Sequence, residues 1–134
     1  MEKKYKLTEE TTNMGGRTLY RIEALRDFSD VKKGDKGGFI ENEKNLSQIS
    51  DCWVYDDAMV YNNAMVYGNA KVYGNAMVYG NAKVYGNAMV YDNARICDNA
   101  KIYGEAVVYG DARVRNDAEF CDNTIVYDDT VIYE

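Results

Sequence analysis

The sequence has no histidine and no proline, and only three cysteines, Cys52, Cys97 and Cys121. Without histidine, the chain lacks the side chain that most often acts as a general base or metal ligand near neutral pH. Without proline, a long stack of paired backbone meets no residue that removes a ladder hydrogen bond. These absences disfavour catalysis and metal binding, so we predict no cofactor and no metal site, and they favour an extended β structure.

Composition narrows the class of protein further. The odd number of cysteines does not suit a disulfide framework, and the start "MEKKYKLTEETT" has no apolar core of a signal peptide. We therefore expect reduced thiols and a cytoplasmic protein. The mean hydropathy of −0.53 predicts no membrane span. The net charge of −6 disfavours binding of duplex nucleic acid.

A six-residue phrase dominates the chain, most regularly in "VYGNAKVYGNAMVYGNAKVYGNAMVY" at residues 66–91. Every sixth residue from Val54 to Ile132 is apolar, and every sixth residue from Ala58 to Ala118 is Ala. The order Ala, variable, Val, Tyr predicts a four-residue strand with Ala and Val inward and the other two outward. The Gly-Asn pair predicts a turn, since both residues tolerate positive φ. Three such phrases close a triangular coil of eighteen residues, and coils should stack about 4.8 Å apart.

The phrase "VYGNAK" resembles the repeat of the hexapeptide-repeat proteins. This resemblance implies an all-β fold, a left-handed parallel β-helix of about five coils, whereas general connection rules would favour right-handed coils. The segment "LYRIEALRDFSDVKKGDKGGFIENEKNLS", followed by "DCWVYDDA", also resembles the start of a family of bacterial and phage proteins. Members are labelled hexapeptide transferases or have no assigned function, so the resemblance speaks for architecture more than activity.

The front of the chain follows a different pattern. Residues 1–37 are predicted to form a hairpin and cap, because the sequence alternates on both sides of "NMGG", and residues 38–134 to form the β-helix. Ile40, Leu46 and Cys52 fall on the inward six-residue register of Ala58. The cap should therefore cover the open strand edge of the first coil.

Sorting outward residues by eighteens gives three faces. The first face carries five tyrosines in one column (Tyr55, Tyr73, Tyr91, Tyr109 and Tyr127) beside a mostly apolar column (Trp53, Lys71, Met89, Val107 and Ile125). An outward apolar patch predicts an oligomer interface. We assign it to Tyr73, Met89, Tyr91, Val107, Tyr109, Ile125 and Tyr127. Alternatively, Tyr simply suits strands, and its hydroxyl suits water. One face is smaller than a stable interface needs, so two faces or the cap must take part, and the resemblance implies a homotrimer.

The second face gathers Arg95, Arg113 and Arg115 on neighbouring coils, with Cys97 among them. Together with Tyr79, these arginines predict a site for a small anion, because guanidinium groups form bidentate bonds with phosphate and carboxylate. The alternative is solvated charge balanced by corner carboxylates such as Asp98 and Asp117. The third face carries Met65, Lys83, Lys101 and Glu119 beside Tyr67, Tyr85, Tyr103 and Cys121. Cys97 and Cys121 lie on different faces and should not pair.

Three functions remain open from the sequence. The resemblance to the hexapeptide-repeat superfamily implies an acyltransferase. However, the acetyltransferases of that superfamily generally use a histidine to deprotonate the acceptor, and this chain has no histidine. A binding protein would use the tyrosine columns as stacking surfaces and the arginines as charge. For a phage member, the resemblance points to sequestering a nucleotide-like host ligand or blocking a host defence protein. A purely structural module is the third. We favour a non-catalytic, homo-oligomeric binding protein.

Overall fold

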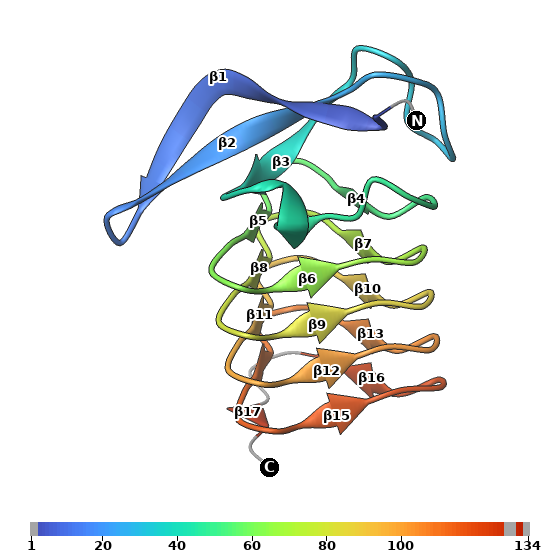
Figure 1. The fold of residues 1–134 in the computed structure, drawn as a ribbon. Helices are drawn as coiled ribbons and strands as arrows, with labels where there is room; N and C mark the ends of the chain where they lie inside the picture. Colours follow the sequence, from blue (N-terminus) through green and yellow to red (C-terminus); the bar gives the residue numbers. More distant parts are fainter. Residues whose placement is uncertain (1–2, 128–130, 133–134) are drawn as a thin grey trace.

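The computed structural model describes residues 3–127 and 131–132. In this part of the chain, regular structure consists of β-strands and one short 3-10 helix, η1 (Glu43–Asn45). None of the described segments forms a helix with the length and apolar character needed to cross a membrane. The predicted all-β solenoid of stacked coils is confirmed (Figure 1).

The chain begins with a hairpin that lies across the top of the stack (Figure 1). Its strands β1 (Tyr5–Met14) and β2 (Arg17–Ala24) are antiparallel, and both turn glycines, Gly15 and Gly16, have positive φ. The predicted hairpin is therefore present. Next, β3 (Lys36–Ile40) pairs antiparallel with β2 and parallel with the first coil strand of the same sheet. The division at residues 37 and 38 falls inside β3 and stays a prediction.

Three sheets form the sides of the coils, and they correspond to the three predicted faces. The first face is the five-stranded sheet of β4 (Trp53–Val54), β7 (Lys71–Val72), β10 (Met89–Val90), β13 (Val107–Val108) and β16 (Ile125–Val126). The second face continues from β3 through β5 (Met59–Val60), β8 (Met77–Val78), β11 (Arg95–Ile96), β14 (Arg113–Val114) and β17 (Val131–Ile132). The third face comprises β6 (Met65–Val66), β9 (Lys83–Val84), β12 (Lys101–Ile102) and β15 (Glu119–Phe120).

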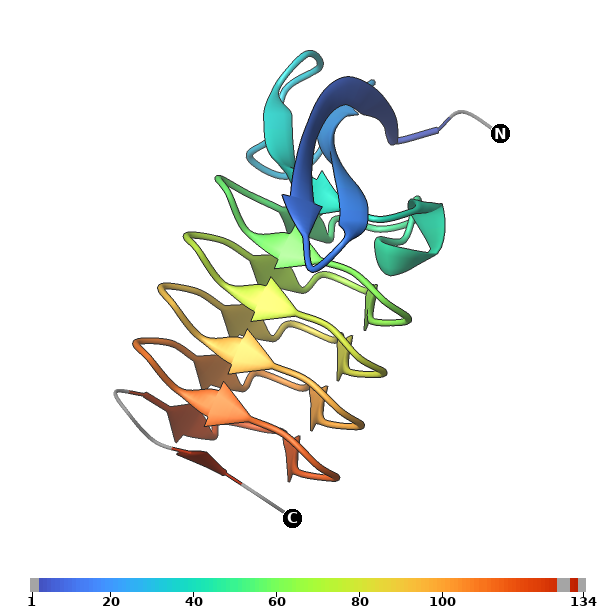
Figure 2. The ribbon, with the colours of Figure 1, turned by 90° about the vertical axis from the view of Figure 1, so that its left-hand side faces the viewer.

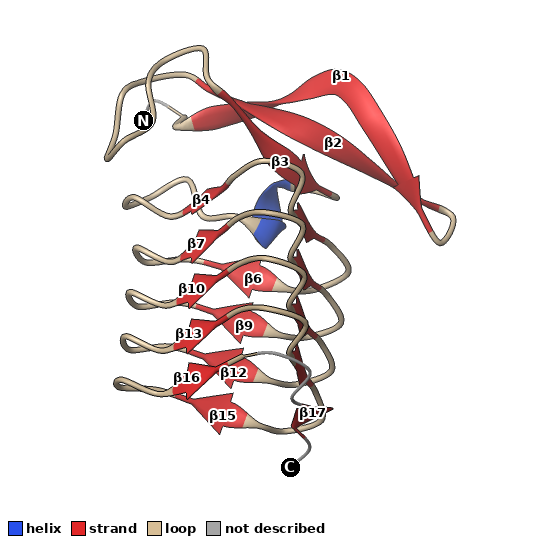
Figure 3. Ribbon diagram, turned by 180° about the vertical axis from the view of Figure 1, so that it is seen from behind, coloured by secondary structure: helices blue, strands red, loops and turns tan. Residues whose placement is uncertain are grey.

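The coils are left-handed and keep the eighteen-residue register. Met89 pairs with Val107, and Arg95 pairs with Arg113, each one coil apart. In Figure 1 the chain passes from β5 across the front through β6 to β7 and returns behind, one level lower, to β8. From behind, β7, β10, β13 and β16 lie one below the other (Figure 3).

The strands are shorter than predicted. Each coil strand from β4 onward has two residues, the variable one and Val, Ile or Phe, because the chain already bends at the next residue, usually Tyr, to enter the corner. Hydrogen bonds between coils nevertheless continue past the strand ends, as in Tyr91 N–H to the Val108 carbonyl at 3.0 Å. The predicted corner turns are present, and the first residue of each pair, such as Gly86 (φ 67°) or Asp92 (φ 60°), has the positive φ.

The inward residues form one continuous core. From Val54 to Ala118, every inward Ala, Val and Ile side chain is at most 1% exposed. Each buried Val or Ile stabilises the fold by roughly 1.5–3 kcal/mol relative to an exposed one. Every coil contributes the same small set of side chains, so the core extends along the solenoid axis and is not concentrated at one point.

The first coil departs from the predicted register. Ile40 and Leu46 are fully buried, but they pair with Val60 and Val66, so they occupy the Val position and not the Ala position. Two additional residues between Leu46 and the next strand account for the shift. They lie in a bend where Ile49 N–H donates to Ser47 Oγ at 3.0 Å. Sequence spacing alone did not reveal this local insertion.

The cap covers the top of the first face. Trp53, predicted to point outward there, is 1% exposed because the rings of Tyr5 and Phe28 pack edge-on against it, with centroids 6.1 and 5.2 Å away. Beside it, the buried Lys4 Nζ donates to the Cys52 carbonyl at 2.7 Å. Burial lowers the pKa of Lys4 and raises that of the Cys52 thiol. Cys52 is therefore part of the core, as predicted.

Candidate anion site on the second face

The tyrosine columns exist as predicted. On the first face, the rings of Tyr73 and Tyr91 are stacked with centroids 4.8 Å apart, and Tyr91 and Tyr109 follow at 5.1 Å. Tyr109 and Tyr127 continue the stack at 5.5 Å. Only the top ring differs, because Tyr55 is turned by 77° and donates its hydroxyl hydrogen bond to Asp30.

Stacking changes what such a column can offer to a ligand. The planes of Tyr73 and Tyr91 differ by 8°, so each ring covers the face of the next. A planar ligand needs an uncovered ring face, whereas a filled column presents ring edges and hydroxyl groups. The expectation that whole tyrosine columns serve as stacking surfaces is therefore wrong. An uncovered face is available only where a column ends or is interrupted.

The second face contains such an interruption. Tyr61 and Tyr79 stack at 5.2 Å, but the next position in their column is Cys97, and the one after it is Arg115. In the neighbouring column, Arg95 lies directly above Arg113. These side chains line a depression of about 90 Å³, whose walls are Tyr79, Arg95, Cys97, Arg113 and Arg115. The structure thus brings together all four predicted anion-site residues, with Cys97 among them as the sequence indicated.

Three of the five side chains that line this depression are arginines. Arg95 and Arg113 are exposed, and within the described ranges neither forms an ion pair. Like charges directly opposite each other on neighbouring strands are destabilising. The corner carboxylate of Asp98 accepts a hydrogen bond from Asn116 N–H at 2.9 Å, and its charge also acts on the Cys97 thiol. An anion between the two arginines would relieve their repulsion.

The thiol in the depression is not activated. Burial raises the pKa of Cys97, and this effect exceeds the opposing influences of the Tyr79 hydrogen bond and the Arg115 charge. Burial likewise raises the pKa of Tyr79, although nearby Arg95 opposes the rise. Both groups are therefore neutral near pH 7, and a neutral thiol is a poor nucleophile. The site is suited to binding an anion rather than to attacking one.

The hairpin bounds the site from above. Leu19 of β2, Phe39 of β3 and Tyr61 form a buried cluster, and Met14, Met59 and Tyr79 pack against it. Figure 2 shows β1 and β2 in front of the uppermost coil of this face. Sequence reasoning missed this contact because it depends on how the hairpin folds back. The apolar outward Met59 and Met77 were the available signal that something covers this part of the face.

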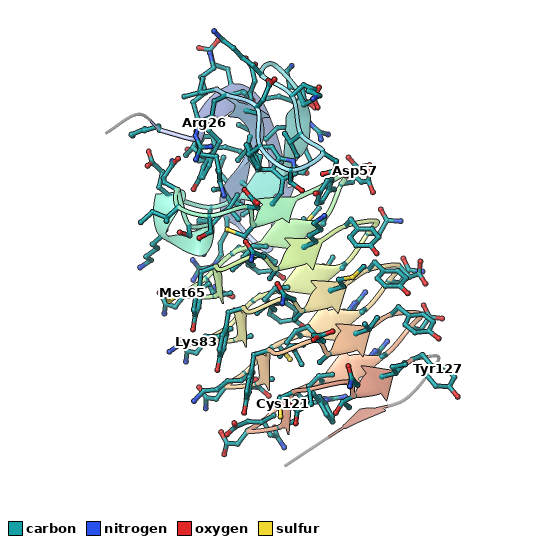
Figure 4. All side chains as sticks on the ribbon, turned by 90° about the vertical axis from the view of Figure 1, so that its right-hand side faces the viewer. Arg26, Asp57, Met65, Lys83, Cys121 and Tyr127 are labelled. Carbon is teal, nitrogen blue, oxygen red and sulfur yellow. The ribbon has the colours of Figure 1, made fainter. Side chains whose placement is uncertain are left out.

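The third face is a natural comparison. In the strand register, Lys83 lies directly above Lys101, and Glu119 lies directly below Lys101. Tyr85 is stacked between Tyr67 and Tyr103 at 4.8 and 4.9 Å. Figure 4 shows Met65 and Lys83 projecting on one side of the solenoid edge and Tyr127 on the other. This face has two stacked cations but a carboxylate beneath them.

The corners serve a structural role. Side chains of Asn63, Asn81 and Asn99 form an asparagine ladder up one column, with hydrogen bonds of 3.4 Å between neighbours. The described cysteines are free, with Cys97 and Cys121 on different sheets as predicted. Within residues 3–127 and 131–132, no three His, Cys, Asp or Glu side chains lie close enough together to hold a metal ion.

Comparison with known proteins identifies the repeat. A model of the YdcK β-solenoid repeat matches residues 54–68, 70–82, 82–94 and 94–110. The uncharacterized acetyltransferase YdcK of Escherichia coli (strain K12) is 47% identical over 38 residues, which is 28% of this chain. That segment covers 12% of the relative's length. The matched residues are thus similar in sequence to a known β-solenoid repeat, in agreement with the stacked coils of the structure.

Proposed function

We propose that this hexapeptide-repeat-like β-solenoid is a non-catalytic binding protein, and that its ligand carries an anionic group held between Arg95 and Arg113. The observation that carries the proposal is the convergence of two stacked arginines, without a carboxylate partner in the described chain, on one depression with Tyr79. Guanidinium groups bind phosphate and carboxylate through paired hydrogen bonds. Two arginines one coil apart in the same column, lining one depression, support the assignment of this group to them.

Self-association is the second part of the proposal. The first face presents the stacked rings from Tyr73 to Tyr127 beside Met89, Val107 and Ile125, and Ile125 is 59% exposed. An apolar column of this kind favours contact with another copy, and a homotrimer is the arrangement that the resemblance suggests. The arginine depression on the second face would then lie near, or inside, a subunit interface.

Catalysis is the weaker candidate. The relative's name suggests acetyl transfer, but the shared segment is 38 residues, or 12% of the relative's length, and the chain has no histidine to deprotonate an acceptor. The Cys97 thiol, whose pKa is raised, does not supply a substitute nucleophile. The cytoplasmic location remains a prediction. It also remains a prediction that this is a phage protein that sequesters a nucleotide-like host ligand or blocks a host defence protein. A purely structural module would lack the anion site altogether.

The test is a nuclear magnetic resonance titration of the isotope-labelled protein with inorganic phosphate. The side-chain N–H signals of Arg95 and Arg113 should move together and saturate at millimolar phosphate. Arg113→Ala should abolish the shift at Arg95, because the two guanidinium groups act as a pair. The matched control is Lys101→Ala, which removes a stacked cation from the equivalent position of the third face.

Equal responses of the lysines and the arginines to phosphate would overturn the proposal, because the effect would then be non-specific screening. Absence of any shift at the arginines would do the same. The oligomer is tested separately by native mass spectrometry: Tyr91→Ser with Tyr109→Ser should yield monomers. Survival of the assembly in that variant would show that the first face is solvated.

A further inference from the structure

We infer that the anionic ligand carries a planar ring, and that this ring occupies the position left empty where Cys97 replaces a tyrosine in the second-face column. The inference rests on the proposed anion site and specifies the class of ligand. It predicts an aromatic or heteroaromatic ring bearing a phosphate or carboxylate, and it assigns Tyr79 as the residue against which the ring stacks.

The spacing of the columns sets the size of the gap. Where the phrase is kept, neighbouring rings lie 4.8–5.5 Å apart, as between Tyr73 and Tyr91 or Tyr109 and Tyr127. Tyr79 has such a neighbour above it, Tyr61, at 5.2 Å. Below it the column continues with the much smaller Cys97, which is hydrogen-bonded to Tyr79 and lines the depression of about 90 Å³ together with it.

The gap is closed on its lower side. Arg115 follows Cys97 in the same column and lines the same depression. The levels of Tyr79 and Arg115 are two coils apart, about 9.6 Å, so a ring midway between them lies about 4.8 Å from each. Aromatic rings stack favourably on tyrosine and on guanidinium planes. A planar ring would therefore be held between a ring above and a cation below.

The volume of the depression limits what is enclosed. A closed cavity of about 150 Å³ in another protein holds benzene, so an open depression of about 90 Å³ encloses only part of one ring and leaves the rest in solvent. Arg95 and Arg113 line the neighbouring column of the same depression, so an anionic substituent on the ring can reach them. Larger parts of a ligand would extend outward.

Two features make this gap different from other positions. Tyr79 is held in place because it packs against the cluster of Leu19, Phe39 and Tyr61 under the hairpin. The other described cysteine in a tyrosine column, Cys121, is the last described member of its column, so no described side chain closes a gap beneath it. Only the Cys97 level combines an uncovered ring, a cation below and two cations alongside within the described residues.

The experiment compares matched pairs of probes by the same resonance titration. Benzoate is compared with cyclohexanecarboxylate, and adenosine 5′-monophosphate with ribose 5-phosphate, so that each pair shares its anion and differs in the planar ring. In the wild-type chain, the ring-bearing member of at least one pair should bind about tenfold more tightly, as expected for one stacked ring. The pair that shows this preference distinguishes an aromatic carboxylate from a nucleotide as the source of the ring.

Cys97→Tyr fills the gap with a ring of the protein itself and should abolish the preference. Cys97→Ser, which leaves the gap open, should retain it. If Cys97→Tyr does not fold, Tyr79→Leu keeps an apolar side chain but removes the ring, and it should also abolish the preference while inorganic phosphate still shifts the Arg95 signal.

The failures of the two ideas can be told apart. If phosphate binds but neither ring-bearing probe binds more tightly than its partner, the planar-ring inference is overturned and the anion site stands. If the preference persists in Cys97→Tyr or in Tyr79→Leu, the ring binds elsewhere and the inference is equally overturned. If phosphate does not bind at all, the proposed function itself fails.

Discussion

The first and second faces of this solenoid are built from the same six-residue phrase, yet they end as different surfaces. On the first face, the rings from Tyr73 to Tyr127 form an unbroken stack beside Met89 and Val107. On the second face, the stack stops after Tyr79, and Cys97 is surrounded by arginines. The backbone is the same in both cases, so the difference lies in a few outward side chains.

This comparison shows where function can be sought in a regular solenoid. Where the phrase is repeated faithfully, side chains satisfy one another, and the surface offers only ring edges and hydroxyl groups to a partner. Where the phrase is broken, a ring face is uncovered and charges lose their periodic neighbours. Departures from the repeat are therefore more informative about ligands than the repeat itself.

The largest effect on stability is expected from ionising the tyrosines at high pH, because this places negative charges in the ring columns of both faces at once. Burial raises the pKa of Tyr73 and Tyr91 on the first face above 10.0, and the neighbouring phenol raises it further. On the second face, burial raises the pKa of Tyr61 and Tyr79, while Arg95 opposes the rise. The folded chain therefore holds these protons more tightly than the unfolded chain does.

The sign of the pH effect follows directly. Stability from these groups is complete below pH 10 and is lost as the pH rises through 10 toward the folded-state pKa values. We expect cooperative alkaline unfolding, with tyrosinate absorbance and loss of the β circular dichroism signal appearing together. Tyrosinate formation centred near pH 10 with an unchanged β signal would contradict the proposed burial.

The next largest effect on stability is expected when a gap like the one at Cys97 is introduced into the tyrosine column of the first face. Tyr91→Cys removes two ring contacts, those with Tyr73 and Tyr109, so it should destabilise the fold by about 1–3 kcal/mol. Tyr91→Phe keeps both contacts and is the matched control. The measurement is urea unfolding at neutral pH.

The gap made by Tyr91→Cys should not bind benzoate, because the adjacent column offers Met89 and Val107 rather than arginines. Binding of benzoate there would show that a gap alone is sufficient.

Much of the fold could be predicted, because the same six-residue pattern recurs many times and each copy indicates the same local structure. The inward Val and Ala positions and the stacking of Tyr73 on Tyr91 follow from an unbroken six-residue register. The first coil could not be predicted in the same way, because Ile40 and Leu46 belong to a coil with two additional residues. A local insertion is invisible when the flanking residues still match a period by chance.

The candidate site was predictable in its members but not in its shape. The eighteen-residue register placed Arg95, Arg113 and Arg115 together with Cys97 among them, and the structure adds the depression. The burial of Trp53 and the packing of Tyr79 under the hairpin were not predictable, because both depend on where the cap folds. Contacts between a repeat and its cap carry no periodic signal.

The smallest effect concerns the charges alone, and it compares the second face with the third. Arg113→Ala removes a cation that lies directly below Arg95, so at low salt it should stabilise the fold by a few tenths of a kcal/mol. Lys101→Ala should change stability less, because Lys101 lies between Lys83 and Glu119, and the repulsion and attraction that it loses nearly cancel.

Salt and phosphate should separate this effect from any change in strand propensity. At high ionic strength the advantage of Arg113→Ala over the wild-type chain should vanish, because exposed charges are screened within about 3 Å at 1 M salt. Phosphate at low ionic strength should instead stabilise the wild-type chain but not Arg113→Ala, since a ligand that binds only the folded state raises its stability. Urea midpoints of the two variants, measured with phosphate and with chloride at equal ionic strength, give both comparisons. Equal responses of Arg113→Ala and Lys101→Ala in all conditions would mean that the two stacked cation pairs are equivalent and that the second face has no special affinity for anions.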